Sequence, residues 1–180
     1  MPSAHEDGTA PVIVVMGVSA SGKSSVAAGL SSALELPWID ADDLHPAANV
    51  AKMASGQPLD DDDRGPWLDR VGEELARGAA ADGIIVACSA LRRTYRDRLR
   101  SAAPRVSFVH LTGSPDLLAS RASARRDHFM PSTLLASQLA LLEPLDGDEA
   151  GTEIDVAPSV ADIIEKALGW MGRHGDQLGD

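Results

Sequence analysis

Nine consecutive residues, GVSASGKSS from Gly17 to Ser25, combine the residue types that bind a phosphate chain. They satisfy the pattern G-x-x-x-x-G-K-[ST], in which glycines let the backbone curl until successive N–H groups point at phosphate oxygens. A following helix adds its dipole, the lysine reaches the β- and γ-phosphates, and the serine hydroxyl ligates Mg²⁺. The motif predicts a site for ATP or GTP made by Gly17, Ser19, Ser21, Gly22, Lys23, Ser24 and Ser25.

Two aspartates, Asp40 and Asp42, lie two residues apart at the end of a short predicted strand, 37–40. The carboxyl ends of parallel strands face the ligand crevice, so both carboxylates should lie beside the phosphate loop. One is suited to hold Mg²⁺ through water, and the other to accept a proton from a hydroxyl group. The alternative interpretation is an Asp-rich helix cap without chemistry.

A third candidate is the stretch LDDDDRGPW, residues 59–67, with four aspartates before an arginine and a tryptophan. Charge runs are usually exposed, and Asp-rich segments with proline usually join elements. An arginine fork, however, suits a carboxylate ligand better than a lysine point charge does. The stretch is either an acidic turn or part of an acceptor site.

Alternating strands and helices must position these groups. Short apolar runs predict buried strands at 12–16, 37–40, 83–88, 105–111 and 152–156. Helical patterns follow the phosphate loop, Ser114 and Ser159, and another covers 132–142. The alternation is typical of a parallel sheet with helices on both faces, so the predicted fold class is an α/β P-loop NTPase sandwich.

The length of 180 residues suits one domain. We expect a flexible N-terminal tail at 1–11, a single kinase domain at 12–168 with a helical lid at about 121–142, and a loose C-terminal tail at 169–180.

The composition restricts the partners and the compartment. The formal net charge of −11 opposes broad binding to nucleic acid or to an anionic membrane. Cys88 is the only cysteine, which excludes an intrachain disulfide and fits a reducing compartment. The N-terminal segment has no signal-peptide pattern, and no apolar run is long enough to span a bilayer. We therefore expect a cytoplasmic protein.

Four motifs, taken together, resemble the gluconokinase family of small P-loop sugar-acid kinases. They are GVSASGKSS, IDADDLHP, KMASGQPLDDDDRGPWL and CSALRRTYRDRLR. The resemblance runs from about Val12 to about Ile164, and the block at 52–68 is its most specific part. More distantly, the layout is similar to shikimate kinase and the nucleoside monophosphate kinases. One departure is Ala20, where many relatives carry glycine, and we expect little effect from it.

The resemblance implies phosphorylation of D-gluconate at its 6-hydroxyl by ATP, on a five-stranded parallel sheet with a mobile lid, in a homodimer. It implies that Arg64 binds the gluconate carboxylate and that Trp67 walls the pocket. Asp62 or Asp63 would cap the following helix and hold the guanidinium of Arg64.

Further candidate contacts with gluconate are His45, Lys52, Ser89 and Arg93. Each has a structural alternative: His45 precedes a proline, Lys52 suits a solvated helix, and Ser89 suits the N-cap of the next helix. Leu91, Tyr95 and Leu99 are expected to form the buried stripe of that helix, which leaves most of its arginines outside.

The lid segment SRASARRDHFMP, 120–131, concentrates arginines. By resemblance, Arg121 lies against adenine, Arg125 meets phosphate in the transition state, and His128 and Gln138 touch gluconate from the lid side. The loop 155–158, with Pro158, flanks adenine. Basic residues at a helix end are also favoured by the dipole alone.

The mechanism expected is in-line transfer of the γ-phosphoryl group. Lys23 and Mg²⁺, held by Ser24 and Asp40, neutralise charge, Asp42 is the base, and Arg125 stabilises the transition state. The alternatives are another small-acid kinase, such as one for shikimate, and a nucleotide-dependent switch. The first usually has a glycine-rich turn where this chain has CSAL, and a GTPase switch would show an N-K-x-D signature, which is absent.

Overall fold

A computed structural model describes residues 10–125 and 134–175. Its elements, in chain order, are β1 (Val12–Met16), α1 (Lys23–Leu34), β2 (Trp38–Asp40), the short 3₁₀ helix η1 (Ala41–Leu44), α2 (Ala47–Ala54), α3 (Asp61–Ala79), β3 (Ile84–Ala87), α4 (Arg93–Ala102), β4 (Ser107–Thr112), α5 (Pro115–Ala124), α6 (Leu134–Leu141), β5 (Gly151–Asp155) and α7 (Val160–His174).

The five strands form one parallel sheet in the order β2-β3-β1-β4-β5. Strand β1 lies in the middle, with Val14 paired to Val86 of β3 and to Phe108 of β4. All five residues of β1 are buried, because helices cover both faces of the sheet there. The predicted five-stranded parallel sheet is confirmed.

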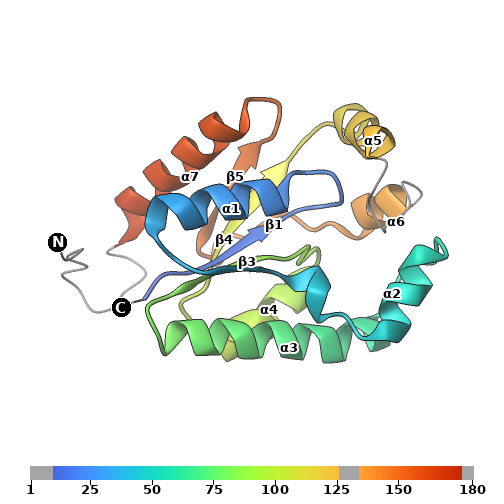
Figure 1. Ribbon diagram of the computed structural model, residues 1–180, viewed down its shortest axis with the longest axis horizontal. Helices are drawn as coiled ribbons and strands as arrows, with labels where there is room; N and C mark the ends of the chain where they lie inside the picture. Colours follow the sequence, from blue (N-terminus) through green and yellow to red (C-terminus); the bar gives the residue numbers. More distant parts are fainter. Residues whose placement is uncertain (1–9, 126–133, 176–180) are drawn as a thin grey trace.

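Helices α1 and α7 cover one face of the sheet, and α3 and α4 cover the other (Figure 1). Each face has its own apolar core: Val26 and Leu30 of α1 belong to the first, and Leu68 and Leu75 of α3 to the second. Helices α5 and α6 lie together at one end of the molecule, close to the turn that joins β1 to α1 (Figure 1). The helices of the expected lid segment thus lie at the end of the molecule where the turn after β1 is found.

The four aspartates of LDDDDRGPW begin a helix rather than a turn. The Asp60 side chain accepts a hydrogen bond from the Asp63 N–H at 2.8 Å, and Asp63 Oδ2 accepts from the Asp60 N–H at 3.0 Å. Acidic side chains also favour the first helical turn because of the dipole. The predicted cap at Asp62 or Asp63 is therefore wrong by position: Asp60 is the N-cap and Asp63 completes the capping box.

The C-terminal helix is longer than expected. Residues 169–174 belong to α7, and the His174 ring stacks on Trp170 with centroids 4.9 Å apart. The prediction of a loose tail from residue 169 is wrong for this part, because the Gly169 and Gly172 positions do not interrupt the helix. Within 10–125 and 134–175, every helix is too short or too polar to cross a membrane.

Candidate functional site

The phosphate loop joins β1 to α1 at the carboxyl end of the central strand, as the motif predicts. Gly17 has φ 149°, and a Cβ there would lie 2.8 Å from the Leu111 carbonyl oxygen. Gly22, with φ 91°, is the N-cap of α1. The two glycines of the motif therefore occupy backbone positions that L side chains disfavour, and the loop leads directly into a helix N-terminus.

Ala20 also has a left-handed backbone conformation, with φ 65°, and its side chain is buried. An L-residue in this region costs on the order of 1 kcal/mol, whereas glycine adopts it freely. The replacement of glycine by alanine at this position therefore has a physical cost in stability.

Lys23 lies at the first position of α1 and donates a hydrogen bond from Nζ to the Val18 carbonyl oxygen at 2.9 Å. Burial lowers the pKa of Lys23, and the nearby carboxylates of Asp42 and Asp40 oppose that shift. Burial raises the pKa of Asp42 to about 6, with Lys23 acting in the opposite direction. The two groups are thus close enough to interact, and Asp42 has a basicity suited to proton transfer near neutral pH.

Ser24 and Asp40 provide the oxygens expected for a metal site. The Ser24 hydroxyl donates to Asp40 Oδ2 at 2.7 Å, while Asp40 Oδ1 accepts from the Asp42 N–H at 3.0 Å. The cap interpretation therefore holds for one carboxylate oxygen of Asp40, and the other faces the phosphate loop. Two hard oxygen ligands fit Mg²⁺, which takes its remaining ligands from phosphates and water. Among the described residues, no cluster of three or more acidic, histidine or cysteine side chains forms a protein-only metal site.

A cavity of about 170 Å³ lies over the phosphate loop. Arg125, at the end of α5, lines it together with Lys23, and its charge contributes to the lowered pKa of Lys23. The cavity brings together Ser19, Ala20, Gly22, Lys23, Ser24, Ser25, Asp40, Asp42, Ser89, Arg125 and Gln138.

Gln138 lies between the phosphate loop and a second cavity. Its Oε1 accepts a hydrogen bond from the Ser19 N–H at 2.6 Å, and its side chain lines both cavities. Asp42 and Ser89 also line both. Ser89 is not the N-cap of the next helix, because α4 begins at Arg93 with Arg92 as its N-cap.

The second cavity, here called the acceptor cavity, is lined by Asp42, His45, Met53, Pro58, Leu59, Arg64, Trp67, Ser89, Leu91, Leu134, Ser137 and Gln138. Its volume of about 30 Å³ leaves room for about one water molecule. A larger ligand therefore requires the walls to separate. Helix α6 supplies one wall, so its movement would enlarge the cavity.

Arg64 is buried on α3, where its guanidinium donates to the Leu59 carbonyl oxygen and to the Tyr95 hydroxyl at 3.4 Å. The group also lies 5.5 Å from the centroid of the Tyr95 ring. Tyr95 in turn donates its hydroxyl proton to Asp61. The expectation that Asp62 or Asp63 holds this guanidinium is wrong, because the guanidinium donates to Leu59 and Tyr95, whereas the Asp63 carboxylate pairs with Lys52.

His45 and Trp67 form the opposite wall of the acceptor cavity. Their rings stack with centroids 4.2 Å apart and an interplanar angle of 13°, and Trp67 Nε1 donates to the Ala41 carbonyl oxygen at 2.7 Å. Burial and the nearby Arg64 lower the pKa of His45 to about 4, so the ring is neutral at neutral pH. Asn49, which the sequence did not suggest, contacts the far side of this ring.

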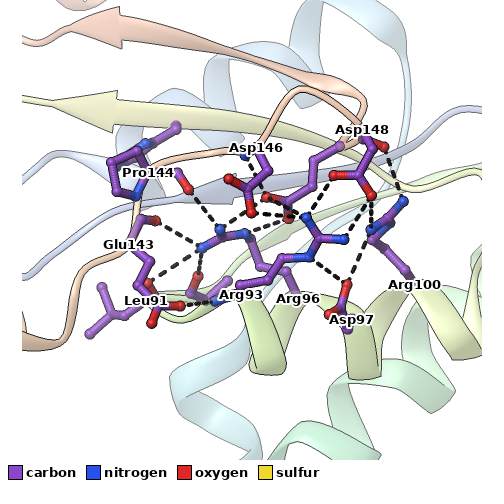
Figure 2. Close-up of polar contacts among 12 residues, drawn as sticks. Leu91, Arg93, Arg96, Asp97, Arg100, Glu143, Pro144, Asp146 and Asp148 are labelled. Carbon is purple, nitrogen blue, oxygen red and sulfur yellow. Dashed lines mark hydrogen bonds and ion pairs between the residues drawn. The ribbon is translucent and has the colours of Figure 1, made fainter.

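Lys52 and Arg93 line neither cavity. Lys52 Nζ lies 2.6 Å from Asp63 Oδ2, which raises the pKa of the lysine and lowers that of the aspartate. Arg93 contacts Asp97, Asp146 and Asp148 (Figure 2). Their predicted contacts with gluconate would require both to leave these partners.

Arg96, which lies beside Arg93 (Figure 2), is fully buried, although most arginines of this segment were expected to lie outside. Its guanidinium pairs with Glu149 at 2.6 Å and donates to the carbonyl oxygens of Ala90, Leu91, Glu143 and Pro144. Arg96 can be buried because tertiary partners satisfy its charge and its N–H groups. It ties the chain after α6 to the turn that follows β3.

Arg121 donates to the Val156 carbonyl oxygen at 2.8 Å, which places it against the 155–158 loop. Pro158 lines a separate groove between β5 and α7, outside the phosphate cavity. The adenine contacts predicted for these two residues stay predictions. His128 and Arg126 lie outside the described residues.

Known proteins resemble this chain in sequence and in structure. Residues 12–145 match the sequence family described as AAA domain. Gluconokinase of Gluconobacter oxydans is 48% identical over 141 residues, covering 76% of this chain and 78% of that protein. Thermoresistant gluconokinase of Escherichia coli is 39% identical over 164 residues, covering 86% and 94%. A solved gluconokinase structure from Sinorhizobium meliloti superposes with a TM-score of 0.85 at 47% identity, covering 93% of this chain and 95% of that chain.

Proposed function

The chain belongs to the gluconokinase family, and we propose that it phosphorylates D-gluconate at the 6-hydroxyl with ATP, giving 6-phosphogluconate. The observation that carries the assignment is the junction of the two cavities. Asp42, Ser89 and Gln138 line both the phosphate cavity and the acceptor cavity. A hydroxyl group of the acceptor beside Asp42 therefore lies next to the position of the terminal phosphate of the nucleotide.

The residues of the phosphate cavity bind and polarise the nucleotide. Backbone N–H groups of the loop and the N-terminus of α1 bind the phosphate oxygens, and Lys23 neutralises the charge of the transferring group. When bound by Ser24 and Asp40, Mg²⁺ supplies further neutralisation of phosphate charge. Arg125 meets the equatorial oxygens, where charge spreads in the transition state.

On the acceptor side, Asp42 orients the hydroxyl and removes its proton as the oxygen attacks in line with the leaving group. Arg64 binds the carboxylate of gluconate. It is buried in the cavity wall, and within the part of the chain that the structure describes its guanidinium contacts a carbonyl oxygen, a hydroxyl and an aromatic ring but no carboxylate. The planar fork matches a carboxylate, and Trp67 bounds the pocket.

A coupled assay with a panel of sugar acids, polyols and nucleotides tests the function. We expect ATP and gluconate to give the highest kcat/KM, and the Lys23→Ala protein, prepared identically, to serve as the blank for contaminating kinases. Higher kcat/KM with shikimate or another acid than with gluconate would refute the assignment.

We further propose that the protein is a cytoplasmic homodimer that uses Mg²⁺. The resemblance to the family supports the dimer, and the single buried Cys88, whose pKa burial raises to about 12, is compatible with a reducing compartment. Light scattering at micromolar concentration tests the dimer. Omission of Mg²⁺ from the assay tests the metal.

A further inference from the structure

The imidazole of His45, in the wall of the acceptor cavity, is held in one orientation by Trp67 and Asn49 and lies near Asp42. One face stacks on Trp67. Nδ1 lies 3.2 Å from Asn49 Nδ2, and Nε2, on the other side of the ring, lies 3.9 Å from Asp42 Oδ1. The side chain is only 3% exposed, so bulk water does not compete for these positions.

The Asn49 amide fixes the proton on this ring. Its Nδ2 lies 2.9 Å from the Asp63 carbonyl oxygen, which can only accept a hydrogen bond. The atom of Asn49 at that position must therefore be the NH₂ group and not the oxygen. The second hydrogen of the same NH₂ group points to His45 Nδ1, which must then be unprotonated. A neutral ring with an unprotonated Nδ1 carries its single proton on Nε2.

The proton on Nε2 points to the side where Asp42 lies. The 3.9 Å separation between Nε2 and Asp42 Oδ1 exceeds hydrogen-bond length. If a hydroxyl oxygen lies about 2.8 Å from both atoms, the angle Nε2–O–Oδ1 at that oxygen is about 90°. Such a hydroxyl can donate its proton to Asp42 while it accepts one from His45. The pair thus presents one acceptor and one donor to a single hydroxyl.

We propose that Asn49 is a positioning residue that holds His45 with its proton on Nε2, so that His45 and Asp42 together bind the hydroxyl that is phosphorylated. The identity of that hydroxyl rests on the proposed function, whereas the position of the proton on the ring does not. As Asp42 removes the hydroxyl proton, the donor on Nε2 stabilises the negative charge that develops on oxygen. The lowered pKa of His45, about 4, keeps the ring a neutral donor.

Two charged residues on other elements influence the charge of the His45 ring. Arg64 of α3 disfavours a charged imidazole, and Asp40 at the end of β2 favours it less strongly. Asn49 itself is 5% exposed, and its side chain spans from α2 to the first turn of α3. A buried amide that joins these two helices and contacts the ring has a structural role too, so the test must separate the two roles.

Long-range ¹H–¹⁵N correlation spectra of the uniformly labelled protein at pH 7.5 provide that separation. The signals of His45 are identified by their disappearance in His45→Gln. We expect an unprotonated Nδ1 and a protonated Nε2 in the wild-type protein without substrate. A proton on Nδ1, or on both nitrogens, overturns the proposal even if gluconate is phosphorylated. A failure to phosphorylate gluconate with the expected spectrum contradicts the proposed function instead.

Kinetics test whether the proton position matters. Asn49→Leu keeps the volume and removes the donor, so we expect mixed tautomers and a loss of about tenfold in kcat/KM for gluconate, the size of one hydrogen bond. The KM for ATP should change less than twofold, and the exposed Val50→Ala on the same helix should leave both constants unchanged. Mixed tautomers with unchanged kcat/KM would overturn the proposal.

Two substitutions at His45 complete the test. His45→Phe keeps a ring against Trp67 but has no donor, and His45→Gln carries an amide N–H near the position of Nε2. We expect His45→Phe to lose about tenfold in kcat/KM for gluconate and His45→Gln to recover part of that loss. Full activity of His45→Phe would show that the ring acts by packing alone, and equal losses in both variants would show that an N–H donor at this position does not matter. Either result overturns the proposal.

Discussion

The phosphate cavity and the acceptor cavity are adjacent, yet they are built in different ways. Six of the eleven residues that line the phosphate cavity come from one short segment, 19–20 and 22–25, whose positions follow from backbone conformation and the start of α1. The acceptor cavity takes its walls from η1, α2, α3, the turn after β3 and α6. Substitutions in the first should therefore act on the nucleotide, and those in the second on the acceptor and on the packing between elements.

Arg125 should give the largest effect, because we propose that it comes from the lid and meets charge that exists only in the transition state. We expect Arg125→Ala to lower kcat by roughly a thousandfold or more, with a smaller change in ATP affinity. Single-turnover kinetics and nucleotide titration measure the two quantities. Arg98→Ala, which removes an exposed arginine paired with Asp69, is the control. Equal losses in kcat and affinity would make Arg125 a simple nucleotide contact.

Asp42 stands where the two cavities meet, so its loss should separate chemistry from binding. Asp42→Asn should lower kcat by about a hundredfold and leave ATP binding nearly unchanged. The exposed neighbour Asp43→Asn serves as the matched control.

The Asp42→Asn variant should also be more stable than the wild type at pH 7.5. Burial raises the folded-state pKa of Asp42 from 3.8 to about 6, so its contribution to stability is greatest below pH 4 and is lost as the pH rises through 6. Removing the charge should raise the free energy of unfolding by about 1–3 kcal/mol. Full activity, or a lower stability, would contradict the role of Asp42 as a buried base.

The pH dependence of the wild-type enzyme should follow the same group. Asp42 must be ionised to accept a proton, so kcat should fall below about pH 6 and reach roughly a tenth of its plateau near pH 5. His45, with a pKa of about 4, should not contribute in this range. Steady-state rates from pH 4.5 to 8.5 at saturating substrates test this. A plateau that extends to pH 5 would mean that Asp42 is not the base.

Substitution of Arg64 should change the binding of gluconate and not that of ATP. Arg64→Lys cannot reproduce the planar fork, so the KM for gluconate should rise by about tenfold, while the KM for ATP stays within twofold. Arg70→Lys on the same helix, whose exposed guanidinium donates to the Leu44 carbonyl oxygen, is the control. A parallel rise in both KM values would show that the carboxylate site has been placed wrongly.

Substitution of Ala20 should give the smallest effect, a change in stability that comes from the backbone conformation of the phosphate loop. Because Ala20 has φ 65°, Ala20→Gly should stabilise the fold by up to about 1 kcal/mol. Ala28→Gly, in the interior of α1, should destabilise it by about 1 kcal/mol. Thermal unfolding compares the two variants. The same sign for both would mean that the loop conformation carries no strain.

The sequence by itself determined the parts that depend on local backbone geometry. The spacing of Gly17, Gly22 and Lys23 identified the phosphate loop. Short runs of four to seven residues identified the strands, because the central strands of a parallel sheet covered on both faces are buried at nearly every position. The Asp40 and Asp42 pair was placed correctly beside the loop, since a strand end points into the crevice.

Tertiary structure alone decided what the buried polar side chains do. Asn49, Tyr95 and Arg96 each have a hydrogen-bond partner 14 to 53 residues away in the chain, which sequence spacing does not reveal. Arg96 could be buried only because Glu149 and four carbonyl oxygens converge on it, and the chain brings them together only when the sheet is complete. A buried polar group is stable where its hydrogen bonds are satisfied, and sequence spacing does not reveal those partners.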